Sequence, residues 1–186
     1  MSIVCCTVKD KIRIASDSIM VRGYTQDKSK DKYAKLCQVN GMIIGSVGLC
    51  EESSMLQIYA STCKPSSPTE LGILNFMVDF AEWKKKKTDK YIIDNDNIIA
   101  FGGKAFELNG LFVKEITTYS AIGAGMDYAL ATLYLGNNVE TAVKVACELS
   151  VYCELPIKIF ETDVTPCLPV PDVKNTLHNV KSTLHK

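Results

Sequence analysis

The sequence carries no surplus of charge of either sign. Its 21 Lys and Arg residues match its 21 Asp and Glu residues, which leaves a formal net charge of zero. Proteins that bind nucleic acids usually concentrate a basic surplus on one face or element. The balance therefore argues against a nucleic-acid partner, and it provides no long-range field to steer a charged ligand.

Long hydrophobic runs are also missing. No stretch of the chain approaches the ~20 apolar residues that a membrane-spanning helix needs. The first nine residues, MSIVCCTVK, hold only a short apolar run with no basic segment before it, unlike a secretory signal peptide. We therefore expect a cytoplasmic protein without a membrane partner.

Patterns that bind metals or cofactors are scarce. There are two histidines, and none of the eight cysteines form a C-x-x-C pair of the kind that holds zinc. The P-loop, G-x-G-x-x-G, H-E-x-x-H and G-x-S-x-G motifs are absent as well. The sequence predicts no metal and no cofactor. Without a secretory signal, the cysteines are expected to be free and mostly buried thiols.

What the sequence does contain is an ordinary globular composition, with 47% hydrophobic and 23% charged residues in 186. This length fits one domain. Past Thr162 the chain becomes polar and holds three prolines close together. We therefore predict a domain over residues 1–162 and a C-terminal tail over residues 163–186.

Apolar periodicity and turn residues predict strands and helices in separate blocks. Strands that alternate in pattern are expected first, around turns such as Asn40-Gly41. Helical spacing begins near Glu51, and Thr69 can cap a second helix that ends in a run of lysines at 84–87, expected to be solvated. The predicted strands are 2–8, 11–16, 33–39, 42–48, 97–101, 104–108, 111–116, 119–123 and 157–160, and the predicted helices are 51–63, 69–87, 128–135 and 138–152.

This block order favours an α+β fold rather than alternating βαβ units. Two antiparallel sheets packed face to face, with a helix pair outside each, would bury the apolar faces as a four-layer αββα sandwich. The helix near 69–83 carries Leu71, Leu74, Phe80 and Trp83 on one side. That is more apolar surface than one sheet face obviously covers, so we expect part of it to form an interface.

Several short motifs then resemble one protein family. They occur in the family's order across residues 2–160, and they are similar to segments of proteasome β-subunits and of the bacterial peptidase HslV. The resemblance implies the αββα fold of the N-terminal nucleophile (Ntn) hydrolases. The matching segments are IASDS at 14–18, DKYAKL at 31–36, IIGSVG at 43–48, AIGAG at 121–125 and SVY at 150–152.

The resemblance also implies a mechanism. In the family the first residue of the mature chain attacks a peptide carbonyl, and its free α-amine takes the proton. A lysine tunes that amine, an aspartate holds the lysine, and a glycine backbone N–H stabilises the oxyanion. Residue by residue, the matches are Ser2 as nucleophile once Met1 is removed, Asp17, Lys32, and Gly48 with Gly45 second.

Two departures from the family pattern bear on activity. Ser2 precedes Asp17 by one position fewer than in the family, and an ungapped alignment would place Met1 at the nucleophile position. The spacing from Asp17 to Lys32 is also one position shorter than in the family. Ala124 stands where the family usually has a serine that supports the amine, so a hydroxyl is missing. These departures argue for reduced, altered or lost activity.

The leading hypothesis is a proteasome-like or HslV-like peptidase subunit that hydrolyses peptide bonds with Ser2. The family implies a homo-oligomeric ring and polypeptide substrates, and it leaves room for an ATPase unfoldase partner. The alternatives are a catalytically silent ring-forming subunit and a small-molecule amidase of the same fold. Cys5 and Cys6 offer another nucleophile, but cleavage before Cys5 leaves too few residues to Asp17, so we interpret the pair as strand packing.

Overall fold

The computed structural model describes residues 2–27 and 34–165, and within these ranges the chain forms two main antiparallel sheets. Strands β1 and β2 form the centre of the four-stranded sheet, in the order β10-β1-β2-β11, and the five-stranded sheet has the order β5-β6-β7-β8-β9. The strands are β1 (Val4–Val8), β2 (Lys11–Ser16), β3 (Val21–Arg22), β4 (Thr25–Gln26), β5 (Leu36–Val39), β6 (Met42–Val47), β7 (Asp96–Phe101), β8 (Lys104–Asn109), β9 (Phe112–Ile116), β10 (Tyr119–Ile122) and β11 (Lys158–Asp163).

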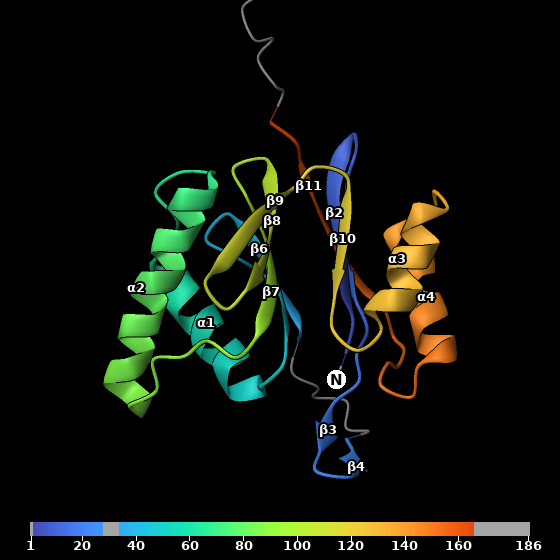
Figure 1. Ribbon diagram of the computed structural model, residues 1–186, viewed down its shortest axis with the longest axis horizontal. Coiled ribbons are helices and arrows are strands. Elements are labelled where there is room, and N and C mark those ends of the chain that lie inside the picture. The colour runs from blue at the N-terminus through green and yellow to red at the C-terminus, as the bar shows by residue number, and fades with distance from the viewer. Residues whose placement is uncertain (1, 28–33, 166–186) are drawn as a thin grey trace, which may run out of the picture.

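Helices cover the outer face of each sheet (Figure 1). Helices α1 (Cys50–Thr62) and α2 (Glu70–Thr88) lie on the five-stranded sheet, whereas α3 (Met126–Tyr134) and α4 (Val139–Leu149) lie on the four-stranded sheet. The expected α+β class is therefore confirmed. In the described part of the chain, no helix combines the length and the apolar character that crossing a membrane requires.

The turn chemistry explains the register of the central hairpin. Asn40 and Gly41 join β5 to β6 with φ angles of 49° and 77°, the left-handed conformation that a two-residue hairpin turn of this kind needs. The register pairs Leu36 with Gly45 and Val39 with Met42. This register fixes the end of β6, and with it the position of the residues that follow Val47.

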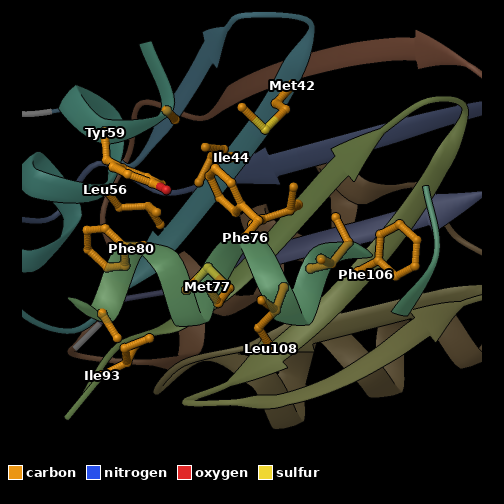
Figure 2. Packing of buried hydrophobic residues seen from close by; sticks show 14 residues of the cluster. Met42, Ile44, Leu56, Tyr59, Phe76, Met77, Phe80, Ile93, Phe106 and Leu108 are labelled. Carbon is orange, nitrogen blue, oxygen red and sulfur yellow. The ribbon is translucent and has the colours of Figure 1, made fainter. Parts of the chain in front are cut away.

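Three buried clusters hold the layers together. The cluster between the sheets includes Cys6, whereas Cys5 faces the cluster under α3 and α4, which confirms that the pair packs on opposite faces of β1. The third cluster lies between the five-stranded sheet and helices α1 and α2 (Figure 2). In that cluster the Tyr59 ring lies 5.4 Å from the Phe76 ring and 5.6 Å from the Phe80 ring, distances typical of attractive aromatic pairs.

The buried side of α2 differs from the predicted one. Ile73 and Phe76 are buried, while Leu71 is 66% exposed. Phe80 is fully buried and can contribute nothing to an interface, so an interface on α2 stays a prediction that depends on exposed side chains such as Leu71. Lys84 is buried as well, whereas the whole lysine run was expected to be solvated. Burial here follows the sheet surface that α2 meets, which the helical period alone does not locate.

Other boundaries moved by a few residues. The strand expected at 157–160 extends to Asp163, one residue past the expected domain boundary, and most of the expected tail lies outside the described residues. Between the predicted strands 11–16 and 33–39, where no regular element was predicted, the described residues contain the short β3–β4 hairpin. The seven cysteines in the described ranges are free, but only Cys5, Cys6 and Cys153 are buried, so the expectation of mostly buried thiols was too broad.

Candidate active site

The candidate site forms around Asp17, which follows the last residue of β2. Its side chain has no exposed surface. Asp17 Oδ1 accepts a hydrogen bond from Ser2 Oγ at 3.0 Å and from Lys35 Nζ at 2.6 Å. The structure therefore brings two of the predicted residues, Ser2 and Asp17, together through one carboxylate oxygen, with a lysine as the third member.

Backbone N–H groups complete the environment of this carboxylate. Ile3 N donates to Oδ1 at 3.0 Å, and Ile19 N and Glu154 N donate to Oδ2 at 3.0 and 3.1 Å. A buried charge is tolerated when it is paired and hydrogen-bonded. These donors come from the residue before β1, from the segment after β2 and from the segment before β11, so three segments that flank strands of the four-stranded sheet fix the position of Asp17.

Lys35 lies directly before β5, and its side chain is 13% exposed. Burial lowers the pKa of this amine, while the charge and hydrogen bond of Asp17 partly oppose the effect. The backbone holds it in place, because Lys35 O accepts from Ser46 N at 3.0 Å. The result is a lysine that loses its proton more easily than an exposed one and is anchored to the carboxylate beside Ser2.

Lys32, the lysine predicted from the family spacing, lies outside the described residues. Its role stays a prediction. Sequence reasoning missed Lys35 because it matched a motif by spacing rather than by strand position. The signal that could have found Lys35 is its place immediately before β5, since that end of the strand lies beside the end of β6.

A cavity of about 90 Å³ opens beside these residues. Gly48, the first choice for the oxyanion glycine, lines it and has a φ of 133°. Gly45, the second choice, packs between the sheets, since a Cβ there would lie 2.6 Å from Val4 Cγ1 and 2.7 Å from Leu36 Cδ2. The side chains that line the cavity with Gly48 include Ser2, Lys35, Ser46, Cys50 and Ser53.

The turn between β10 and α3 closes the site from the other side. Gly125 N donates to Ser2 O at 3.2 Å, and a Cβ on Gly123 would lie 2.5 Å from the same oxygen. The turn therefore packs against the backbone of Ser2. Ala124 lies between these glycines, is exposed and carries no hydroxyl.

The two cysteines of β1 have an environment unsuited to nucleophilic attack. Cys5 and Cys6 are fully buried. Burial raises the pKa of Cys6 to about 12, and burial, with a smaller effect of Cys6, raises the pKa of Cys5 even further. A thiol must be ionised to act as a nucleophile. This geometry supports their interpretation as packing residues.

Comparison with known proteins gives a fold and no closer relationship. No protein-family model matches the sequence, and no curated protein matches it. Solved structures do match. The structure titled Thiobacillus denitrificans BPH in complex with epoxomicin has a TM-score of 0.78 at 20% identity, covering 88% of this chain and 100% of that chain. The chain has the Ntn-hydrolase fold.

Two further structures share this Ntn-hydrolase fold. Eukaryotic HslV from Trypanosoma brucei has a TM-score of 0.64 at 16% identity, covering 87% of this chain and 99% of that chain. Anbu (ancestral beta-subunit) from Yersinia bercovieri has a TM-score of 0.65 at 12% identity, covering 100% of this chain and 98% of that chain. The likeness thus extends to several proteasome-like proteins, and it singles out no particular one.

Proposed function

We propose that this chain is a proteasome-like peptidase subunit, built as a four-layer αββα sandwich, that hydrolyses peptide bonds with Ser2 as an N-terminal nucleophile. The observation that carries the proposal is the meeting of Ser2 Oγ and Lys35 Nζ on Asp17 Oδ1, beside a cavity that Gly48 also lines. A nucleophile, a tuning cation and a backbone donor in one cavity are what acyl transfer requires.

The proposed chemistry begins with removal of Met1, which leaves Ser2 with a free α-amine. An unperturbed α-amine has a pKa of about 7.7–8.0, so it can accept the Ser2 Oγ proton near neutral pH. The oxygen attacks the peptide carbonyl, the oxyanion is bound by the Gly48 N–H, and the amine passes its proton to the leaving amine. Water then hydrolyses the ester on Ser2 and restores the free hydroxyl.

Lys35 is the lysine that we assign to this mechanism. Its positive charge disfavours a second positive charge on the α-amine, which lowers the pKa of that amine and keeps it available as a base. Asp17 holds Lys35 in place. Lys32 remains the alternative for the same role, and the two assignments are separated by testing both lysines in parallel.

The deciding experiment combines intact-mass measurement with turnover of a fluorogenic peptide. We expect loss of one methionine, activity in the wild type, and activity losses of about 10³-fold or more in Ser2→Ala and Lys35→Ala. Lys32→Ala and the exposed-loop control Ser66→Ala should retain activity. If Ser2→Ala cleaves the peptide as fast as the wild type, Ser2 is not the nucleophile. If only Lys32→Ala loses activity among the two lysine variants, the tuning role belongs to Lys32.

A catalytically silent ring-forming subunit is the second candidate. Ser2 is only 1% exposed, and Ala124 lacks the hydroxyl that the family usually has beside the amine. Retained Met1 in protein made in a bacterial cytosol would favour this candidate. If the missing hydroxyl is the only defect, Ala124→Ser should gain activity. A small-molecule amidase would instead cleave short acyl amides and leave longer peptides intact.

The expected assembly, location and substrates depend on the proposed function. We propose a homo-oligomeric ring in the cytoplasm that acts on polypeptides. An ATPase unfoldase would be its partner only if folded substrates are degraded. The resemblance supports these proposals, and degradation of an unfolded against a folded protein by the purified chain tests the need for an unfoldase.

A further inference from the structure

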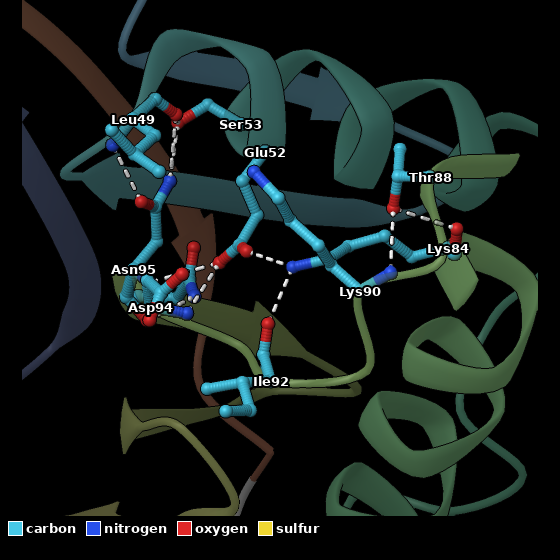
Figure 3. A network of polar contacts seen from close by, with 10 residues as sticks. Leu49, Glu52, Ser53, Lys84, Thr88, Lys90, Ile92, Asp94 and Asn95 are labelled. Atoms are coloured by element: carbon cyan, nitrogen blue, oxygen red, sulfur yellow. Dashed lines mark hydrogen bonds and ion pairs between the residues drawn. The ribbon is translucent and has the colours of Figure 1, made fainter.

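A network of buried polar groups that the proposed chemistry does not use lies next to Gly48. Figure 3 shows the members of this network around Asn95. Asn95, which is 1% exposed, is its centre. Asn95 Oδ1 accepts from Leu49 N at 2.6 Å, and Asn95 Nδ2 donates to Leu49 O and to Ser53 Oγ, each at 2.9 Å. One side-chain amide therefore binds both backbone polar groups of the residue that follows Gly48.

Asn95 also packs directly against Gly48. A Cβ at position 48 would lie 2.1 Å from Asn95 Oδ1, so the amide occupies the space that a side chain would need. The backbone of Gly48 has a φ of 133°, a conformation that other residues rarely adopt. Gly48 therefore packs against Asn95 on one side and lines the cavity on the other, and only a residue without a Cβ fits there.

A buried ion pair holds Asn95 in turn. Glu52 Oε1 accepts from Asp94 N at 3.0 Å and from Asn95 N at 2.9 Å. Its other oxygen pairs with Lys84 Nζ, which also donates to Ile92 O at 2.6 Å. Figure 3 shows how this pair ties α1 and α2 to the segment before β7. The contacts of the Glu52 carboxylate and the Lys84 ammonium thereby restrain the backbone of residues 92–95.

A second connection leads from Asn95 back to the cavity. Asn97 Nδ2 donates to Asn95 O at 3.2 Å, and Asn97 Oδ1 accepts from Ser46 Oγ at 2.7 Å. Asn95, Asn97 and Ser46 are all buried. The network therefore contacts the chain on both sides of Gly48, through the side chain of Ser46 two residues before it and through the backbone of Leu49 directly after it.

We propose that Asn95, held by the Glu52–Lys84 pair, is a positioning residue that fixes the Gly48 N–H for the oxyanion. The inference rests on the proposed function, and it assigns this network a role in catalysis through Gly48. Donors aimed at a developing charge work because they need no reorganisation during the reaction. A Gly48 peptide free to rotate would lose that advantage while the cavity still admitted substrate.

The first test measures the backbone and needs no activity. In Asn95→Ala, hydrogen exchange read by mass spectrometry on a peptide spanning residues 46–50 should show at least about tenfold faster exchange, because Leu49 N–H loses its acceptor. Asn109→Ala is the matched control, since the exposed Asn109 binds the half-buried Asp96 carboxylate on the same sheet. Unchanged exchange at 46–50 in Asn95→Ala would overturn the inference, whether or not the wild type cleaves peptides.

The second test measures whether Asn95 acts on catalysis through Gly48. Asn95→Asp keeps an acceptor for Leu49 N–H, so exchange at 46–50 should stay slow, but its negative charge lies against Gly48 and opposes an oxyanion. We expect kcat to fall about 10–100-fold in both Asn95 variants with KM within about threefold, as loss of oxyanion stabilisation predicts. An unchanged kcat in an active enzyme would overturn the inference and leave Ser2 chemistry intact. A wild type that cleaves nothing would overturn the proposed function, and the exchange measurement would still decide the positioning.

Discussion

Asp17 has more assigned partners than any other side chain of the candidate site. Among the described residues, its two oxygens accept from Ser2, Lys35 and three backbone N–H groups. Without the carboxylate, the Ser2 hydroxyl, the Lys35 amine and these backbone N–H groups would all lose this acceptor. The loss would be most costly for Lys35, because its charge has little contact with water and would lose its counter-ion. Asp17 therefore both stabilises the fold and positions the Ser2 side chain.

Asp17→Asn should therefore lose both activity and stability. The amide keeps one acceptor oxygen but places an NH₂ group against backbone donors and removes the charge that balances Lys35. Breaking a buried pair costs about 3–5 kcal/mol, which urea unfolding would measure alongside peptide turnover. Asp10→Asn is the control, because Asp10 pairs with Arg13 at an exposed turn and should change little. Full activity in Asp17→Asn would show that Lys35 needs no anion.

Lys35 gives a pH dependence with a defined sign. Burial lowers its pKa in the folded chain below the ordinary 10.5 of the unfolded chain. Between these two values the unfolded state binds more protons, so the free energy of unfolding gains from this group as pH rises through the window. Urea unfolding from pH 7 to pH 10.5 should show this gain in the wild type relative to Lys35→Met. A difference between the two proteins that stays constant with pH would contradict it.

At the scale of elements, sequence patterns predicted the strands and helices correctly. They did not predict burial where it depends on a residue far away in the sequence. The Asn40-Gly41 turn and the capped start of α2 at Thr69 were predicted from neighbouring residues alone, and both are confirmed. Lys84 was assigned to a solvated run, although it follows Phe80 by one helical turn on the buried side. Its burial depends on Glu52, which lies 32 residues earlier in the sequence. Lys35 was missed for a different reason, because the family motif was matched by its spacing rather than by its position relative to β5.

The Glu52–Lys84 pair between α1 and α2 leads to a prediction on those helices. Both side chains are 5% exposed, so Lys84→Met would leave the Glu52 carboxylate buried without a cation. We expect a loss of about 3–5 kcal/mol in the free energy of unfolding. Lys104→Met removes a comparable pair with Glu115 at the surface and should cost about 1 kcal/mol or less. Equal losses from the two variants, measured by urea unfolding, would mean that burial of the pair adds nothing.

At the scale of the whole molecule, exposed apolar side chains indicate where subunits would meet. Most of the large exposed ones in the described ranges lie between Met126 and Ile159, whereas α2, the helix expected to form an interface, presents Leu71. Tyr134 and Leu135 at the end of α3 are 78% and 76% exposed. Adjacent apolar side chains at such exposure are typical of interaction surfaces when they belong to a larger patch. The α3–α4 side is therefore the better candidate for assembly.

This reasoning predicts an assembly that depends on the end of α3. Light scattering of the wild type should find a species of many subunits at micromolar concentration. The double variant Tyr134→Glu and Leu135→Glu should shift it toward smaller species, because assembly would then bury two charges without partners. Leu71→Glu on α2 is the matched control and should assemble normally, since it changes one exposed leucine on the other layer of helices. A monomeric wild type would contradict the ring, while an assembly disrupted only by Leu71→Glu would place the interface on α2 after all.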